Sequence, residues 1–143
     1  MRMNQCLWKM TIFYSCLFVV SSCENKPAYY TVADFEKVSK TDSHFHYNTR
    51  DVRYLKFADS LNFRLVSPNV DTEMPIDSQL QIASWIKRQF PDKFAFFGTF
   101  SVDSFGKVGF AEKTIARIDR CMKAGACGIK IWKNIGMYPN ARF

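Results

Sequence analysis

The amino-acid sequence predicts an α/β fold with a parallel sheet, because strand-like and helix-like segments alternate along most of the chain. Strands are expected to begin near residues 40, 63, 93 and 128, with amphipathic segments between them. Parallel neighbours need crossover connections, which are right-handed and place the helices outside the sheet. Two architectures satisfy this alternation: an open α/β sheet, or the first four βα units of a (β/α)₈ barrel of the TIM type, whose full length is about 250 residues.

Apolar periodicity and breaker residues set the expected bounds of each element. The predicted strands cover residues 40–46, 62–70, 93–101 and 128–132. The predicted helices cover residues 31–39, 52–61, 75–90 and 109–124. Pro75 suits a first helical turn, and apolar residues then recur on one helical face: Ile76, Leu80, Ala83 and Ile86. The third strand is apolar enough to be buried on both faces.

The N-terminal segment, residues 1–23, predicts a bacterial lipoprotein signal peptide. Arg2 and Lys9 precede an uncharged apolar stretch over residues 10–20, which is shorter than the roughly 20 residues that span a bilayer. The following Val-Ser-Ser-Cys resembles a lipobox and makes Cys23 the expected lipidation site. The alternative is an ordinary secretory signal. Residues 24–30 would be a tether, and residues 31–143 a domain held by its lipid at a membrane of the bacterial envelope, on the periplasmic or surface side.

The charge distribution argues against a nucleic-acid partner. The formal net charge is +7, but the 20 Lys and Arg residues are spread along the sequence and form no basic run. The sequence also contains no Gly-rich phosphate loop, no GxSxG nucleophile elbow and no CxxC pair.

Aromatic and cysteine residues in the second half of the chain are interpreted as core. Packing against helices is favoured over a ligand-stacking wall for a cluster of phenylalanines: Phe94, Phe96, Phe97, Phe100, Phe105 and Phe110. Cys121 and Cys127 are expected to be small buried residues rather than a disulfide. The polar residues 69–72 and 101–104 follow the second and third strands, where they either contact a substrate or begin the next helix.

The chain contains two histidines, His44 and His46, one residue apart in Asp42-Ser43-His44-Phe45-His46. Side chains at i and i+2 of a strand share a face, so both imidazoles could reach one metal ion, and Asp42 would share that face. Their position at the carboxyl end of a first strand is where barrels and open α/β sheets bind ligands. The alternative is a polar pair bonded to backbone or water. A catalytic zinc site needs three protein ligands, so at least one more must come from elsewhere.

Two tracts of the chain resemble the amidohydrolase superfamily, in particular its amidohydrolase-related branch. These are the Asp42-x-His44-x-His46 motif and residues 125–133, Gly-Ala-Cys-Gly-Ile-Lys-Ile-Trp-Lys. The resemblance implies a (β/α)₈ barrel with one or two divalent metal ions, most readily zinc, and makes His44 and His46 metal ligands. Lys130, or second to it Lys133, would match the carboxylated lysine that bridges two metals in some branches. The alternative for Lys130 is a substrate-facing cation or a structural ion pair.

The resemblance further implies a metal-dependent hydrolase acting on an amide, ester, lactone or related bond of a small molecule. Trp132 and Lys133 are the candidate substrate-binding residues. The family's later histidine ligands and catalytic aspartate have no counterpart here, so the chain is expected to be an N-terminal part and inactive by itself. The alternatives are a non-catalytic envelope lipoprotein, which would be a binding or assembly module and possibly a homo-oligomer, and a truncated product with open sheet edges.

Overall fold

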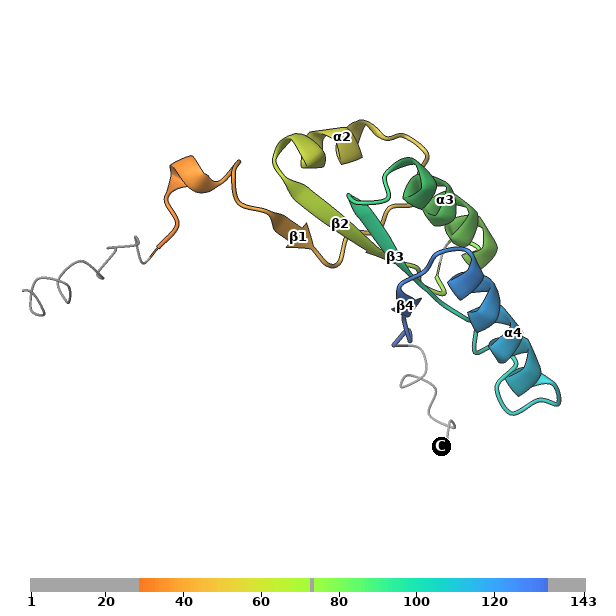
Figure 1. The fold of residues 1–143 in the computed structure, drawn as a ribbon. Helices are drawn as coiled ribbons and strands as arrows, with labels where there is room; N and C mark the ends of the chain where they lie inside the picture. The colour runs from red at the N-terminus through yellow and green to blue at the C-terminus, as the bar shows by residue number, and fades with distance from the viewer. Residues whose placement is uncertain (1–28, 73, 134–143) are drawn as a thin grey trace, which may run out of the picture. The chain divides into compact units, whose positions relative to one another are not determined.

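The structure, a computed structural model, describes residues 29–72 and 74–133 (Figure 1). From Ala33 onward, the described residues form one compact unit. Strands and helices alternate in chain order: η2 (Val32–Asp34), β1 (Lys40–Asp42), α2 (Arg53–Ser60), β2 (Phe63–Pro68), α3 (Ile76–Gln89), β3 (Phe94–Gly98), α4 (Phe110–Lys123) and β4 (Gly128–Ile129).

The four strands form one parallel sheet in the order β1-β2-β3-β4. In the register of neighbouring strands, Asp42 lies beside Leu65, Leu65 beside Phe94, and Phe97 beside Gly128. All four strands therefore end at the same edge of the sheet, from which the loops to the helices leave. The predicted α/β fold with a parallel sheet is confirmed.

The helices α2, α3 and α4 follow one another along the same side of the sheet (Figure 1). Burial alternates along β3, where Phe94, Phe96 and Gly98 are buried and the residues between them only partly so. The buried set faces the helices. The third strand is thus fully buried on one face only, in contrast to the two buried faces expected from its composition.

The hydrophobic core lies between the sheet and the helices. It joins side chains from all three helices to the two central strands, to the segment after β1 and to the turn before β4: Tyr47, Leu55, Ala58, Leu65, Leu80, Ala83, Ile86, Phe94, Phe96, Cys121 and Ala126. Core packing is therefore the role of Phe94 and Phe96. Phe105, by contrast, is exposed and meets the Phe110 ring edge-on with centroids 5.4 Å apart.

The two cysteines behave differently. Both are free, as expected, but only Cys121 is buried, whereas Cys127 is exposed. The expectation of burial was wrong for Cys127 because it lies in the turn before β4, where its amide N–H donates to the Phe96 carbonyl and its side chain is not part of the core.

All four strands are shorter than predicted, and the first predicted helix and the first predicted strand differ most in a way that local interactions explain. The helix predicted over residues 31–39 is reduced to the 3-10 turn Val32–Asp34, none of whose residues is buried, so no packing stabilises a longer helix. The strand predicted over residues 40–46 ends at Asp42, because the Asp42 carboxylate accepts a hydrogen bond from the backbone N–H of His44 and turns the chain at Ser43.

The predicted signal peptide with Cys23, and residues 24–28 of the predicted tether, lie outside the described residues. Within the described ranges, no helix has both the length and the hydrophobicity needed to cross a bilayer.

Candidate metal site after the first strand

The segment after β1 places the two histidines. Phe45 donates its backbone N–H to the Val66 carbonyl at 3.2 Å, and Tyr47 donates its backbone N–H to the Ser67 hydroxyl at 2.9 Å. Phe45 and Tyr47 pack on the core, whereas His44 and His46 are exposed. The histidines therefore share one side of the segment, as the i and i+2 spacing predicts, although the segment has left the strand.

The two imidazoles converge on each other. Their Nε2 atoms lie 3.2 Å apart, and the ring planes are inclined by 67°. Two nitrogens that ligate the same tetrahedral zinc ion at about 2.0–2.1 Å are about 3.3 Å apart, so this spacing matches that of a shared metal ion. A hydrogen bond between the rings gives the same distance when one Nε2 carries a proton and the other does not. The geometry fits a metal without requiring one.

Asp42 does not join the histidines as a ligand. Its Oδ1 accepts the His44 backbone N–H at 3.0 Å, so the carboxylate fixes the turn instead of continuing the strand face. In the part of the chain that the structure describes, no three His, Cys, Asp or Glu side chains lie close enough together to hold a metal ion. The expectation that Asp42 shares the histidine face assumed an uninterrupted strand, whereas β1 ends at Asp42.

Lys130 lies at the far edge of the sheet from the histidines. It follows β4, and the order of the strands puts β2 and β3 between it and the segment after β1. With neighbouring strands about 4.8 Å apart, the two ends are separated by roughly 14 Å along the sheet. Its backbone is fixed on both sides, because Lys130 N–H donates to the Gly98 carbonyl at 2.7 Å and the Lys130 carbonyl accepts the Thr99 hydroxyl at 3.0 Å.

Trp132 and Lys133 lie together, just beyond Lys130. The ammonium of Lys133 lies 5.2 Å from the centroid of the Trp132 ring, and the ring is partly buried while the lysine is exposed. Such a pair presents an aromatic face and a cation to the same solvent region. The structure thus brings the two candidate substrate-binding residues together with each other, but not with the histidines.

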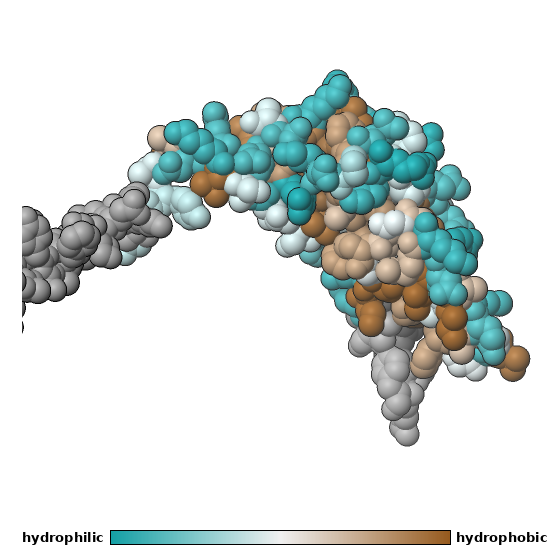
Figure 2. Space-filling model, in the orientation of Figure 1, coloured by the Kyte–Doolittle hydropathy of each residue, from teal (hydrophilic) through white to brown (hydrophobic). Residues whose placement is uncertain are grey.

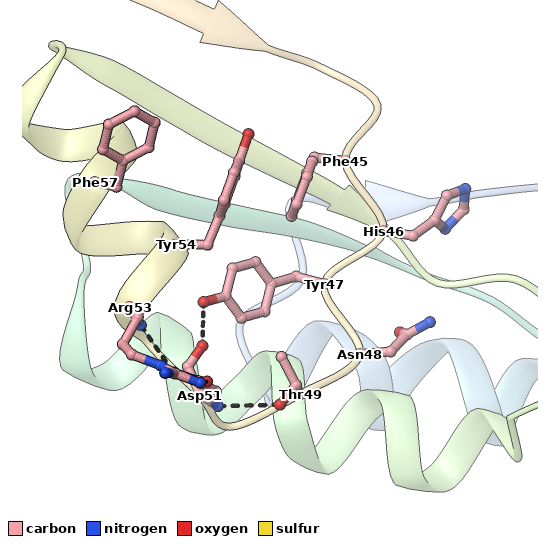
Figure 3. A pocket seen from close by; sticks show the side chains of 9 residues that line it. All are labelled: Phe45, His46, Tyr47, Asn48, Thr49, Asp51, Arg53, Tyr54 and Phe57. Carbon is pink, nitrogen blue, oxygen red and sulfur yellow. Dashed lines mark hydrogen bonds and ion pairs between the residues drawn. The ribbon is translucent and has the colours of Figure 1, made fainter.

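A pocket of about 420 Å³ lies between the histidine segment and α2, and His46 is among the residues that line it (Figure 3). The Phe45 and Tyr54 rings stack in its wall with centroids 4.6 Å apart, and His46 points away from this stack. Tyr47 donates its hydroxyl to the Asp51 carbonyl at 2.6 Å. Burial, with a smaller effect of the Asp51 charge, raises the pKa of the Tyr47 phenol, so the hydroxyl stays protonated and remains a donor.

The burial of several polar side chains at the carboxyl edge of the sheet was not predicted from the sequence. Gln79 accepts the Val70 N–H at 3.0 Å and donates to the carbonyls of Val70 and Met74, each at 2.7 Å. Arg117 donates to the carbonyls of Thr99 and Ile76, and its guanidinium also pairs with Asp77. The burial of Gln79 could have been predicted from its position, since it lies beside Leu80 on the apolar face of its helix.

Asn69 is the least satisfied of these buried groups. Its side chain is 1% exposed, and its Nδ2 atom makes no hydrogen bond to the described residues. Its backbone N–H donates to the Phe97 carbonyl at 2.9 Å, which places it just after β2 at the same sheet edge as the histidines.

Comparisons with protein-family models, with curated proteins and with solved structures gave no match. The functional interpretation therefore depends on the residues and their geometry.

Proposed function

We propose that this chain is the N-terminal part of a metal-dependent hydrolase of the amidohydrolase type, in which His44 and His46 hold a divalent ion, most readily zinc. The observation that carries the proposal is the 3.2 Å separation of their Nε2 atoms directly after the first strand of a parallel sheet. Two exposed imidazoles that face each other at ligand spacing are suited to chelate one cation.

The arrangement of the sheet supports a (β/α)₈ barrel over an open α/β sheet. In a doubly wound sheet the strand order reverses at a switch point and helices cover both faces. Here the strands are ordered as they occur in the chain, and α2, α3 and α4 lie along one side (Figure 1). Four consecutive units of a barrel would have this arrangement.

A closed barrel would also explain how the histidines and Lys130 serve one site. Lys130 follows Gly128, which is paired with Phe97 on the sheet face away from the helices, and alternation puts Lys130 on that same face. In a barrel this face points to the axis, around which the strand ends converge. His44, His46 and Lys130 would then border a common space, with Trp132 and Lys133 available to contact a small-molecule substrate.

The chemistry that a bound divalent ion supplies is a water molecule of lowered pKa and a polarised substrate carbonyl, which suits cleavage of an amide, ester or lactone. The contribution of this chain would be to hold and orient the ion through the two imidazoles. A catalytic site needs at least three protein ligands. We therefore expect the 143-residue chain to bind metal without appreciable hydrolysis.

Metal titration of the purified full chain tests the proposal. We expect Zn²⁺ binding measured by calorimetry, and Co²⁺ binding measured by visible absorption, to weaken roughly tenfold or more in His44→Ala and His46→Ala, because even contacts that only support ligands are worth 10–100-fold. Binding at this site should vanish in the double variant. The matched control is Asn48→Ala, which removes an exposed side chain from the same segment.

Thiols also bind cobalt, so the decisive quantity is the difference between the histidine variants and Asn48→Ala. It is measured in a background in which serine replaces Cys127, the exposed thiol of the described residues, and also Cys6, Cys16 and Cys23. An unchanged metal affinity in the double histidine variant would overturn the proposal. The close approach of the rings would then be explained by a hydrogen bond between them.

A further inference from the structure

The backbone around His46 is attached to β2 on both sides. On one side the Phe45 N–H donates to the Val66 carbonyl at 3.2 Å, and on the other the Tyr47 N–H donates to the Ser67 hydroxyl at 2.9 Å. The first bond is between backbone groups. The second depends on a side chain, so it can be removed without changing the backbone of either segment.

Ser67 supplies this bond from a completely buried position. Its side chain is 0% exposed and Tyr47 is 2% exposed, so water cannot replace the hydroxyl as partner of the Tyr47 N–H. The Tyr47 side chain is also fixed, by its hydroxyl bond to Asp51 and by edge-on packing against Phe94 with ring centroids 5.9 Å apart. Tyr47 is therefore a rigid anchor directly after His46.

The two histidines are supported in the same way. The His44 N–H donates to the Asp42 carboxylate at 3.0 Å, and the N–H of the residue after His46 donates to Ser67. A side-chain oxygen thus fixes a backbone N–H at or next to each histidine. For His44 it is the Asp42 carboxylate, and for His46 it is the Ser67 hydroxyl, which lies on β2. This cross-strand bond sets the position of His46 relative to the sheet.

We propose that Ser67 is a positioning residue of the metal site, which holds His46 so that its Nε2 atom meets that of His44. The inference rests on the proposed function. Without the hydroxyl, the Tyr47 N–H would be buried and unpaired, which is costly, and the segment would move to find another partner. A displaced His46 lowers metal affinity because both imidazoles must reach one ion from fixed positions.

The test is zinc affinity of Ser67→Ala in the full chain, with Ser84→Ala as the matched control. Ser84 is also a buried serine, but its hydroxyl donates to the Gln81 carbonyl within α3. We expect Ser67→Ala to weaken zinc binding by about 10–100-fold, the usual effect of removing a group that orients a ligand. Ser84→Ala should stay close to the unsubstituted chain. Ser67→Cys keeps a weak acceptor and should recover part of the affinity.

Amide hydrogen exchange gives a readout that general destabilisation would not reproduce. The Tyr47 amide should exchange slowly, and saturating zinc should slow it further, because metal binding and the Ser67 bond favour the same conformation. Ser67→Ala should lose this zinc-dependent protection at Tyr47 while retaining protection at the core strands. If Ser67→Ala fails to fold, the effect of zinc on exchange of the Tyr47 amide in the unsubstituted chain still tests the role of Ser67.

The outcomes separate the two proposals. If the unsubstituted chain binds no zinc through its histidines, the proposed function fails and this inference fails with it. If it binds zinc and Ser67→Ala binds equally well, or if zinc leaves the Tyr47 amide unaffected, only the role of Ser67 is overturned.

Discussion

At the scale of single residues, the charged pair beside the aromatic pocket has a clear electrostatic consequence. The guanidinium of Arg53 donates to both carboxylate oxygens of Asp51, with Nε 2.8 Å from Oδ2, and the Arg53 backbone N–H donates to Oδ1 at 3.0 Å. These bonds stabilise the charged form and lower the pKa of Asp51 from 3.8 to about 2. Both residues lie on the surface, so salt weakens the effect.

Replacing Arg53 with Gln should return the pKa of Asp51 towards 3.8. The pKa is depressed in the folded chain, so the stabilisation that the pair contributes is present above the unfolded value and is lost as the pH falls through about 2. The carboxyl carbon shift of Asp51, followed by NMR against pH, measures the change. Lys56→Gln, an exposed lysine on α2, is the control. Titration of Asp51 near its ordinary value in the unsubstituted chain would contradict the prediction.

The sequence predicted the pairing of His44 and His46 but not the role of their neighbour Asp42. Spacing alone places two side chains on one side of an extended segment. A short carboxylate, however, competes for backbone N–H groups, and here Asp42 ends the strand. Arg117 was missed for a related reason. A charged residue on a helix is expected to be solvent-exposed. The sequence does not show that backbone carbonyls of other elements surround the Arg117 guanidinium.

At the scale of elements, α2, α3 and α4 were predicted more closely than the strands, whereas the helix predicted over residues 31–39 was not found. The apolar stripe of α3 lies in its own sequence, so its expected range of 75–90 differs from Ile76–Gln89 by one residue at each end. Strand length depends instead on the partner. β4 ends at Ile129, which lies beside Gly98 at the end of β3, so the predicted strand to residue 132 has no paired neighbour to follow. Pairing of this kind cannot be read from local composition.

The contact between α4 and β3 depends on the missing side chain of Gly98. A Cβ atom there would lie 2.5 Å from Cβ and 2.6 Å from Sγ of Cys121. We expect Gly98→Ala to lower the free energy of unfolding by about 1–3 kcal/mol, because the helix must move away from the sheet. Urea unfolding of the full chain measures this.

The control is a double-mutant cycle with Cys121→Gly. That substitution removes both clashing atoms, so the cost of Gly98→Ala should be much smaller in its background. Equal costs in the two backgrounds would show that the close approach of α4 does not depend on this glycine.

At the scale of the whole molecule, the sheet has two outer strands with one described partner each. β1 pairs with β2, and β4 pairs with β3, and no other pairing involves these two strands within the described part of the chain. Figure 2 shows hydrophobic side chains at the surface over α4 and β4. The exposed hydrophobic residues on α4 and just after β4 include Ile115, Met122 and Ile131. Open strand edges beside apolar surface favour association between chains.

We therefore expect the full chain to self-associate with rising concentration, and Ile131→Lys to reduce this association. A charge next to the end of β4 disfavours pairing with another strand. Sedimentation velocity over a range of concentrations measures the effect. Val108→Lys introduces the same charge at a fully exposed position in the loop before α4, away from the strand edge. An equal effect of the two lysines would mean that added charge alone, and not the edge, controls association.

The side-chain amide of Gln79 pairs with both the N–H and the carbonyl of Val70, and also with the carbonyl of Met74. One residue of the helix thus holds both ends of the turn between β2 and α3, and within the turn the Thr72 N–H also donates to the Val70 carbonyl at 3.1 Å. Substitutions at residues 71 and 72 should then leave both ends of the turn, and the strand and helix that it connects, in place.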